Sequence, residues 1–289
     1  MTASTLIPTV RTRRELRNII GGWRKDGASI GVVPTMGALH IGHLKLVHTA
    51  LEQTDKVIVT LFVNPRQFNN AEDLANYPRT ELEDAAKLSP LGAHVLYAPR
   101  PEEIYPEGFS TNISVGRVSE GLCGAHRSGH FDGVATVVTK LLLQTQADKA
   151  FFGEKDYQQL HVIKRLVNDL DIPVGIVPVP TVREADGLAY SSRNQRLTAA
   201  ERAIAPALAS ALFTASRMLA AGGNPDLALQ EARQTILNAG FTMIEYLELR
   251  AEDNLAPLQI PDRPARLLVA AWLGDVRLID NVPVTISGS

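Results

Sequence analysis

Along the first 180 residues, short continuous apolar runs alternate with blocks in which apolar residues recur at helical spacing. The apolar run at 29–33, ended by Pro34, predicts a strand. Leucine and valine recur at helical spacing over 43–54, and the β-branched run at 56–63 predicts a second strand. This strand–helix–strand order is typical of the βαβ unit of a parallel sheet.

The same alternation continues as far as Val179. It predicts helices at 11–25, 82–88, 134–144 and 158–170, and strands at 94–98, 149–152 and 173–179. We therefore expect residues 1–181 to form a doubly wound, Rossmann-like α/β domain. Ligands of such a domain bind at the carboxyl ends of the strands, and most of the polar clusters follow a predicted strand.

The pattern changes near Pro180. Two helices are predicted at 199–220 and 226–239, separated by Gly222-Gly223-Asn224-Pro225. Strand-like runs follow at 244–250, 266–273 and 276–286. Helices followed by antiparallel strands indicate a smaller α+β domain over 182–289, which we expect to act as a lid.

Composition narrows the function classes. Of 289 residues, 45% are hydrophobic and 21% charged, and the net charge of −2 provides no overall field for nucleic acid. No apolar run is expected to reach the ~18 residues of a membrane span, and no signal peptide is evident. The single cysteine, Cys123, suits a reducing compartment and is interpreted as a small turn residue. These features predict a cytoplasmic protein.

The most informative cluster follows the first predicted strand of the βαβ unit. Gly37 and Gly42 allow close approach of the backbone to a ligand, and a helix N-terminus offers unpaired N–H groups to phosphate. His40 and His43 project to one face and can donate to a phosphate as pyrophosphate leaves. The alternative is a capping or metal-binding pair, but the sequence lacks the pattern of a zinc site.

Two further clusters could bind phosphate. Gly153-Glu154-Lys155-Asp156 follows the strand at 149–152, and Lys155 supplies a point charge there. Tyr190-Ser191-Ser192-Arg193 carries two hydroxyls and a guanidinium in one loop. A charged surface turn explains the first cluster equally well, and a helix N-cap followed by a solvated arginine explains the second nearly as well.

Smaller signals surround the second strand and a later basic loop. Gln67, after Asn64, can hold a hydroxyl or carboxylate through its amide. Tyr77 and Arg79 are interpreted as packing and surface residues. Arg127 and His130 flank a glycine and could cover an anionic substrate if that loop folds over the site.

Seven blocks together resemble the pantothenate synthetase (pantoate–β-alanine ligase) family, which belongs to the HIGH-motif nucleotidyl-transferases. In chain order they are VVPTMGALHIGHLKLV, LFVNPRQF, YPRT, RSGHFDGVATVV, FFGEKDYQQL, ADGLAYSSRN and AAWLGDVRLIDN. The resemblance implies that pantoate attacks Mg²⁺-bound ATP to give pantoyl adenylate and pyrophosphate. β-Alanine then displaces AMP to give pantothenate, and the family implies a homodimer.

Residue roles follow from the same resemblance. The implied catalytic residues are His43, as the acid assisting pyrophosphate, with His40, Lys155 and Arg193. ATP would be lined by Met36, Gly37, Ala38, Leu39, His40, Ile41, Gly42, His43, Gly153, Glu154, Lys155, Asp156, Val182, Tyr190, Ser191, Ser192 and Arg193. Pantoate and β-alanine would be held by Gln67 and Gln159, with Asn64, Arg127 and His130 as neighbours.

Two positions depart from the family pattern. Ile41 stands where relatives often carry an acidic residue, and Tyr190 stands where Met or Leu is more usual. We expect Tyr190 to change the packing surface offered to adenine. A plain nucleotidyltransferase is an alternative function, and pantoate-dependent pyrophosphate exchange would separate the two. An RNA-binding module is a second alternative, which the acidic balance and the lack of a Lys/Arg stripe oppose.

Overall fold

The computed structural model describes residues 6–69 and 71–285, and the chain divides into two compact units. The first unit comprises residues up to 119, with 127–154 and 162–180, and the second comprises 120–126, 155–161 and 181–289. Two short segments, 120–126 and 155–161, therefore group with the C-terminal part of the chain. The first five and last four residues lie outside the described residues. They include the beginning of the N-terminal segment that was considered as a signal peptide, and the last residue of the strand predicted at 276–286.

The first unit contains a six-stranded, fully parallel sheet with the order β1-β4-β3-β2-β5-β6. Its strands are β1 (Thr9–Val10), β2 (Ile30–Thr35), β3 (Lys56–Leu61), β4 (Val95–Tyr97), β5 (Lys149–Gly153) and β6 (Gly175–Val179). The chain order reverses between β2 and β5, which makes this pair the topological switch point of the sheet. The sequence analysis did not predict β1, a two-residue strand that pairs with β4 at the edge of the sheet.

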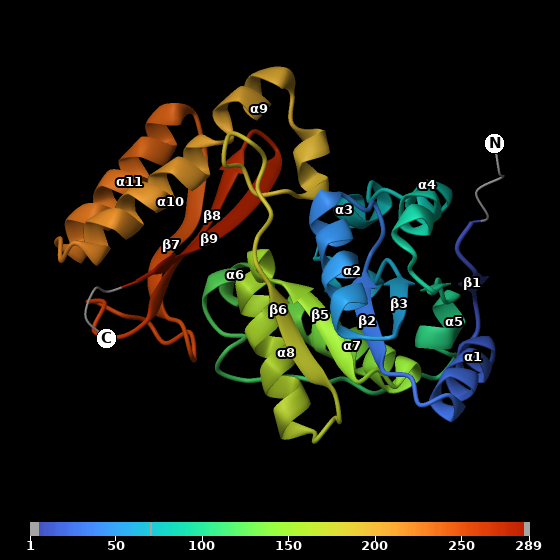
Figure 1. Cartoon of the computed structure of the whole chain (residues 1–289). Coiled ribbons are helices and arrows are strands. Elements are labelled where there is room, and N and C mark those ends of the chain that lie inside the picture. The colour runs from blue at the N-terminus through green and yellow to red at the C-terminus, as the bar shows by residue number, and fades with distance from the viewer. Residues whose placement is uncertain (1–5, 70, 286–289) are drawn as a thin grey trace. The chain divides into compact units, whose positions relative to one another are not determined.

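Helices connect these strands (Figure 1). They are α1 (Arg13–Lys25), α2 (Ile41–Gln53), α3 (Ala71–Ala75), α4 (Glu81–Leu88), α5 (Pro101–Ile104), α7 (His130–Thr145) and α8 (Tyr157–Asp169), whose first five residues group with the second unit. Leu46, Val47 and Ala50 of α2 pack on Val33 and Val59 of the sheet. The helix between two parallel strands thus buries one apolar face, as the helical spacing predicted.

Several predicted ends shift for identifiable reasons. Helix α1 begins at Arg13 because Thr12 accepts from Glu15 N in a capping box. Strand β2 continues through Pro34 to Thr35, so the prediction that proline ends it was wrong. β2 pairs with β5 only at Gly31 and Val32, so the missing N–H of Pro34 falls where that side of the strand has no ladder.

The second unit is built on an antiparallel sheet with the order β7-β8-β9. Figure 1 shows α10 and α11 side by side along this sheet. The elements are α6 (Leu122–His126), α9 (Ala199–Ile204), α10 (Ala207–Ala220), α11 (Pro225–Ala239), β7 (Met243–Ala251), β8 (Ala265–Leu273) and β9 (Val276–Val284). Helices and antiparallel strands segregate here, and parallel strands alternate with helices in the first unit. The structure confirms the predicted α/β fold class with a smaller α+β part.

The helix predicted at 199–220 is divided into α9 and α10, because Pro206 cannot donate the next helical hydrogen bond. By length and composition alone, this segment is the one candidate membrane span among the described residues, contrary to the sequence expectation. Leu208, Leu212 and Leu219 on it are buried in the core of the second unit. Burial of this kind is typical of a core helix.

Cys123 was also misplaced by the sequence analysis. It lies within α6, is buried, and its Sγ lies 3.1 Å from the hydroxyl oxygen of Tyr246 on β7. The predicted packing role of Tyr77 is confirmed, because its buried ring contacts Phe68 at 5.5 Å between centroids. Arg79 is exposed, as expected.

Candidate active site

The turn from Thr35 to His43 follows β2 directly and opens α2. Gly37 has a φ of +88° and Ala38 a φ of +51°, so the chain passes through two left-handed residues in succession. Such a backbone is costly for Ala38 and needs support from its surroundings. Gly37 itself has little room, because an added Cβ would lie 3.2 Å from an oxygen of Asp84.

Asp84 on α4 provides that support, and sequence reasoning missed it. Its side chain is fully buried, and its two carboxylate oxygens accept from Ala38 N at 2.9 Å and Leu39 N at 2.7 Å. Thr80 Oγ1 donates to the same carboxylate at 3.1 Å, and Lys87 Nζ donates to Leu39 O at 2.8 Å. An acidic residue inside the buried face of a predicted helix was the available signal, since buried carboxylates are paired or hydrogen-bonded.

The two histidines form a reciprocal cap at the start of α2. His40 is the N-cap residue and its Nδ1 accepts from Gly42 N at 3.1 Å. His43 Nδ1 accepts from His40 N at 3.3 Å, and the two ring centroids lie 4.1 Å apart. The expectation of unpaired N–H groups at this helix start was therefore wrong for Gly42. Because each Nδ1 is an acceptor, each neutral imidazole carries its proton on Nε2.

Gln67 lies beside this turn, at the end of a 3₁₀ turn that follows β3. Its side-chain Nε2 donates to Met36 Sδ at 3.0 Å, and its Oε1 accepts from Asn64 Nδ2 at 3.0 Å. Thioether sulfur is a weak acceptor, so the bond to Met36 is readily exchanged for one to a substrate oxygen. The structure thus brings Gln67 and the start of the histidine turn together.

Asn64 is almost fully buried, and its amide is used within the first unit. Besides Gln67 Oε1, Nδ2 donates to Gly133 O at 3.0 Å, and Oδ1 accepts from the Tyr105 hydroxyl at 2.8 Å and from Arg66 N at 3.3 Å. Burial raises the pKa of Tyr105 to about 12, so this hydroxyl stays protonated as a donor. All four hydrogen-bonding positions of Asn64 are occupied, which identifies a residue that orients Gln67.

Arg127 and His130 converge on the main chain of Gln67. His130 Nδ1 lies 2.8 Å from Gln67 O, and Arg127 donates to the same carbonyl at 3.2 Å. Arg127 Nη1 lies 3.1 Å from His130 Nε2, so Nδ1 carries the proton that reaches the carbonyl. His130 is buried at the first position of α7. The basic loop therefore contacts the main chain of Gln67 inside the first unit.

Gly153 and Glu154 lie at the carboxyl end of β5, the other strand of the switch point. Apart from its chain neighbours, no atom of the described residues lies within 4 Å of the place where a Cβ would stand on Gly153. Packing therefore imposes no requirement for glycine at this position. The remaining predicted residues belong to the second unit: Lys155, Asp156, Gln159, Val182, Tyr190, Ser191, Ser192 and Arg193.

Within the second unit, Lys155 is mostly buried and its Nζ lies 4.0 Å from Asp156 Oδ2. Gln159 is half-buried. Tyr190 N donates to Val182 O at 3.0 Å, closing the loop that precedes the two serines. Ser191 Oγ accepts from Arg193 N at 3.2 Å, the helix-capping arrangement that was the alternative interpretation of this loop.

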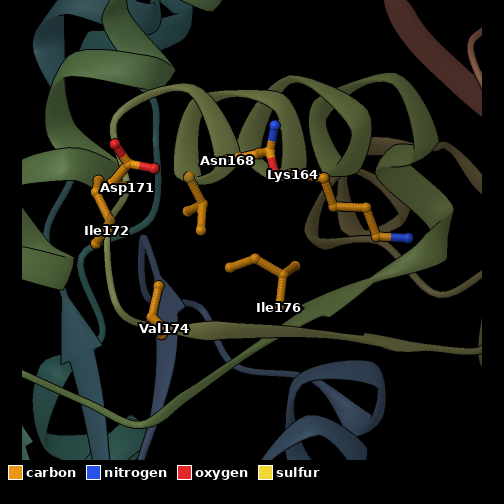
Figure 2. A pocket seen from close by; sticks show the side chains of 7 residues that line it. Lys164, Asn168, Asp171, Ile172, Val174 and Ile176 are labelled. Carbon is orange, nitrogen blue, oxygen red and sulfur yellow. The ribbon is translucent and has the colours of Figure 1, made fainter.

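Other features lie away from these residues. An open groove of about 510 Å³ runs between α8 and the chain leading into β6, at the amino end of that strand (Figure 2). None of the predicted site residues lines it; its walls are Lys164, Val167, Asn168, Asp171, Ile172, Val174 and Ile176. Among the described residues there is no group of three or more His, Cys, Asp or Glu side chains suited to a metal ion.

A parallel sheet with a His-x-Gly-His turn at the start of α2, the helix between β2 and β3, defines an α/β enzyme of the nucleotidyl-transferase type. Residues 8–283 match the sequence model of the family described as Pantoate-beta-alanine ligase. The chain belongs to this family.

Relatives and solved structures match this chain along nearly its whole length. A pantothenate synthetase of Chelativorans sp. (strain BNC1) is 69% identical over 278 residues, covering 96% of this chain and 98% of that protein. The crystal structure of pantothenate synthetase from Thermus thermophilus matches with a TM-score of 0.91 and 44% identity, covering 96% of this chain and 99% of that one. A pantoate–β-alanine ligase from Francisella tularensis, complexed with β-γ ATP and β-alanine, matches with a TM-score of 0.81 and 36% identity, covering 96% and 97%.

Proposed function

We propose that this ligase condenses pantoate with β-alanine to pantothenate at the expense of ATP, through a pantoyl adenylate. A pantoate carboxylate oxygen attacks the α-phosphorus, and the bond from that phosphorus to the bridging oxygen of the β-phosphate breaks. The neutral amine of β-alanine then attacks the acyl carbon, and AMP leaves. The observation that carries the proposal is the reciprocal histidine cap at the switch point of the sheet.

His40 and His43 act in this proposal as hydrogen-bond donors to the phosphates. Their Nδ1 atoms accept from the main chain, which fixes both rings and leaves Nε2–H as the donor of each. The fixed orientation sharpens the sequence-based role of His43, because a neutral Nε2–H suffices to stabilise charge on the departing pyrophosphate. Donors that are already oriented need no reorganisation as charge develops, which is how preorganised sites lower a barrier.

Gln67 holds the pantoate in this proposal, and the family resemblance assigns Gln159 to the same substrate. Asn64 fixes the side chain of Gln67, while His130 and Arg127 fix its carbonyl. A neutral amide is suited to this task, since an attacking carboxylate must keep its nucleophilicity. A tight arginine clamp would stabilise the ground state more than the transition state.

The nucleotide is assigned to the remaining predicted residues. Gly153 leaves space for close approach, and Lys155 and Arg193 supply positive charge to the phosphates. Ser191 and Ser192 donate hydroxyls, and Tyr190 faces the adenine. Mg²⁺ arrives on the phosphates as part of the substrate. We further propose a cytoplasmic homodimer, supported by the family resemblance and the single cysteine.

The test is ATP–pyrophosphate exchange measured on the purified protein. We expect exchange of labelled pyrophosphate into ATP that requires pantoate and proceeds without β-alanine. Adding β-alanine should yield one AMP for each pantothenate. Exchange that ignores pantoate would overturn the adenylation step, and AMP release that needs no amine would count against the ligase.

A further inference from the structure

Two neighbouring residues in the middle of β9, Asp280 and Asn281, have no role in the proposed chemistry. Both are buried, with 4% of their surface exposed. Polar side chains at such depth are retained at a cost unless their hydrogen bonds are made, so the partners of these two residues are informative. The partners Lys155, Arg183 and Arg266 lie in the second unit.

Asn281 reaches the main chain of the proposed phosphate-binding lysine. Its Nδ2 donates to Lys155 O at 3.0 Å, and its Oδ1 accepts from Arg266 Nη1 at 2.7 Å. Because a guanidinium only donates, Arg266 determines which end of the amide is the oxygen and directs the NH₂ group to Lys155. Arg266 is held in turn by Glu252 Oε1 at 2.9 Å and lies 3.8 Å above the ring of Tyr157.

Asp280 reaches the start of the serine–arginine loop through Arg183. The two side chains form a bidentate pair with distances of 2.6 and 2.8 Å, and the carboxylate is 2% exposed. Arg183 also donates to Gly187 O at 3.0 Å and to Asn281 O at 3.2 Å. Its main chain forms a bridge with Ala189, just before Tyr190. Arg183 therefore ties the segment 183–189, which leads to Tyr190, to β9.

We propose that Asp280 and Asn281 are positioning residues for the nucleotide: Asn281 sets the main chain at Lys155, and Asp280, through Arg183, sets the loop that leads to Tyr190–Arg193. The two residues are joined, since Asn281 N donates to Asp280 Oδ1 at 2.7 Å. One dipeptide of β9 thus holds two segments that lie far apart in the sequence. The inference rests on the proposed function, in which both segments bind ATP.

The lysine side chain is long and loses conformational freedom when its ammonium is held on a phosphate. Fixing the main chain at its root reduces the number of conformations to be restricted when ATP binds. Loss of the Asn281 donor should therefore weaken binding of substrate and transition state equally. Such a change raises KM for ATP and leaves kcat nearly constant.

Asn281→Asp tests this with one changed atom. The substitution keeps the acceptor for Arg266 and replaces the NH₂ that faces Lys155 O with an oxygen. In pantoate-dependent exchange we expect KM for ATP to rise about five- to tenfold, the size of one lost buried hydrogen bond, with kcat within about twofold. A fall in kcat at unchanged KM would overturn the proposal.

Gln144→Glu is the matched control. Gln144 on α7 is equally buried, its Nε2 donates to Glu103 O at 3.0 Å, and its Oε1 accepts from the Tyr97 hydroxyl at 2.8 Å. The same amide-to-acid change there lowers stability without touching a proposed nucleotide residue. We expect an unchanged KM for ATP. An equal rise in both variants would show that general loosening, rather than positioning, causes the effect.

A double-mutant cycle with Lys155→Ala separates this inference from the proposed function. If Asn281 acts through Lys155, Asn281→Asp changes KM for ATP less than about twofold once the lysine side chain is gone. The same fold-increase in both backgrounds would overturn the inference while leaving the role of Lys155 intact. An unaltered KM for ATP in Lys155→Ala alone would instead overturn the role of Lys155, and the inference with it.

Arg183→Lys tests the other arm, independently of Lys155. Lysine keeps the charge beside Asp280 but cannot make the bidentate pair or reach both carbonyls. We expect KM for ATP to rise about three- to fivefold, with thermal unfolding of the variant measured in parallel. An unchanged KM in a variant that has lost stability would limit Asp280 and Arg183 to a structural role.

Discussion

The turn Thr35–His43 and the loop Val182–Arg193 are both assigned to ATP in the proposed function, but they are held in different ways. The turn is fixed by the fully buried carboxylate of Asp84, which accepts hydrogen bonds from two main-chain N–H groups. The loop is attached near its start by the buried pair of Arg183 with Asp280. Its outer side is joined to α9 by Arg202, which pairs with Glu184 and Asp186. Those three side chains are between 23% and 40% exposed.

The difference matches the demands of the two segments. Donors that stabilise a developing charge must already be in place, and a buried, charge-assisted anchor provides this. A loop that binds phosphates must exchange its internal bonds for bonds to the ligand, as Ser191 must when it releases Arg193 N. We therefore expect substitutions around the turn to affect the rate of adenylation and those around the loop to affect the ATP requirement.

The largest effect is expected for His43→Ala. It removes one fixed donor to the departing pyrophosphate, and the exchange rate should fall roughly 10²–10³-fold. His48→Ala is the matched control, because His48 lies on the same helix, is exposed and pairs with Glu52 on the helix surface. Near-normal exchange in His43→Ala would contradict the assigned role, as would an equal loss in the control.

The next effect is expected for Asp84→Asn. An amide cannot accept from both Ala38 N and Leu39 N without turning its NH₂ toward one of them, so one buried N–H loses its partner. This costs about 1–3 kcal/mol of stability and disturbs the turn, and we expect exchange to slow about tenfold. Rates are to be compared at equal folded fraction, measured by urea unfolding.

Asp148→Asn is the control for that variant. The Asp148 carboxylate accepts from Ile30 N at 2.6 Å, at the amino end of the same strand that leads into the turn. It should lose a similar amount of stability while keeping its exchange rate per folded molecule. If both variants slowed equally, the contribution of Asp84 would be stability alone.

Much of the fold could be predicted from the sequence because its periodicities are strong. The alternation of apolar runs with helical spacing gave the doubly wound order, and the glycine–proline segment after 220 separated the last two helices. Errors arose where tertiary context outweighed local signals. Pro34 stays in β2 because the neighbouring strand β5 pairs with β2 only at Gly31 and Val32 and needs no N–H from residue 34. Strand β1 was missed because two residues are too few to show any period.

The proposed site also contains residues that the sequence predicts and residues that only tertiary contacts reveal. The histidines, Gln67 and Lys155 stand in recognisable blocks, and their residue types suggest the chemistry. The roles of their supports were not predictable: Asp84, Arg183 and Asn281 act through contacts with residues far away in the sequence, although Asn281 itself stands in one of the blocks. A single sequence does not show which distant carbonyl or N–H group a polar side chain will meet.

A moderate effect on pantoate is expected for His130→Ala. This variant loses the donor to Gln67 O, and KM for pantoate should rise about fivefold while KM for ATP is unchanged. His130→Asn is the matched variant, since its amide nitrogen stands near the place of Nδ1 and should restore most of the affinity. Equal losses in the alanine and asparagine variants would argue against this hydrogen bond as the cause.

The smallest effect is expected for Arg202→Ala, the outer support of the loop. Exposed ion pairs contribute below about 1 kcal/mol, so we expect a change of that size in the free energy of unfolding at pH 7 and less than a twofold change in KM for ATP. The hydrogen bond from Arg202 lowers the pKa of the Asp186 carboxyl below its usual value. A lowered folded-state pKa contributes stability that is fully present above the unfolded value of about 4 and is lost as pH falls through the folded value.

The stability difference between the wild type and Arg202→Ala should therefore be constant from pH 7 to pH 5 and shrink toward pH 3. Arg165→Ala, which breaks the exposed pair with Asp169 on α8, should leave KM for ATP unaltered and thus controls for the loss of a surface cation. A tenfold rise in KM for Arg202→Ala alone would mean that the outer side of the loop is as critical as its buried attachment to Asp280. The contrast between a rigid turn and an adaptable loop would then fail, because the loop too would depend on a fixed anchor at its surface.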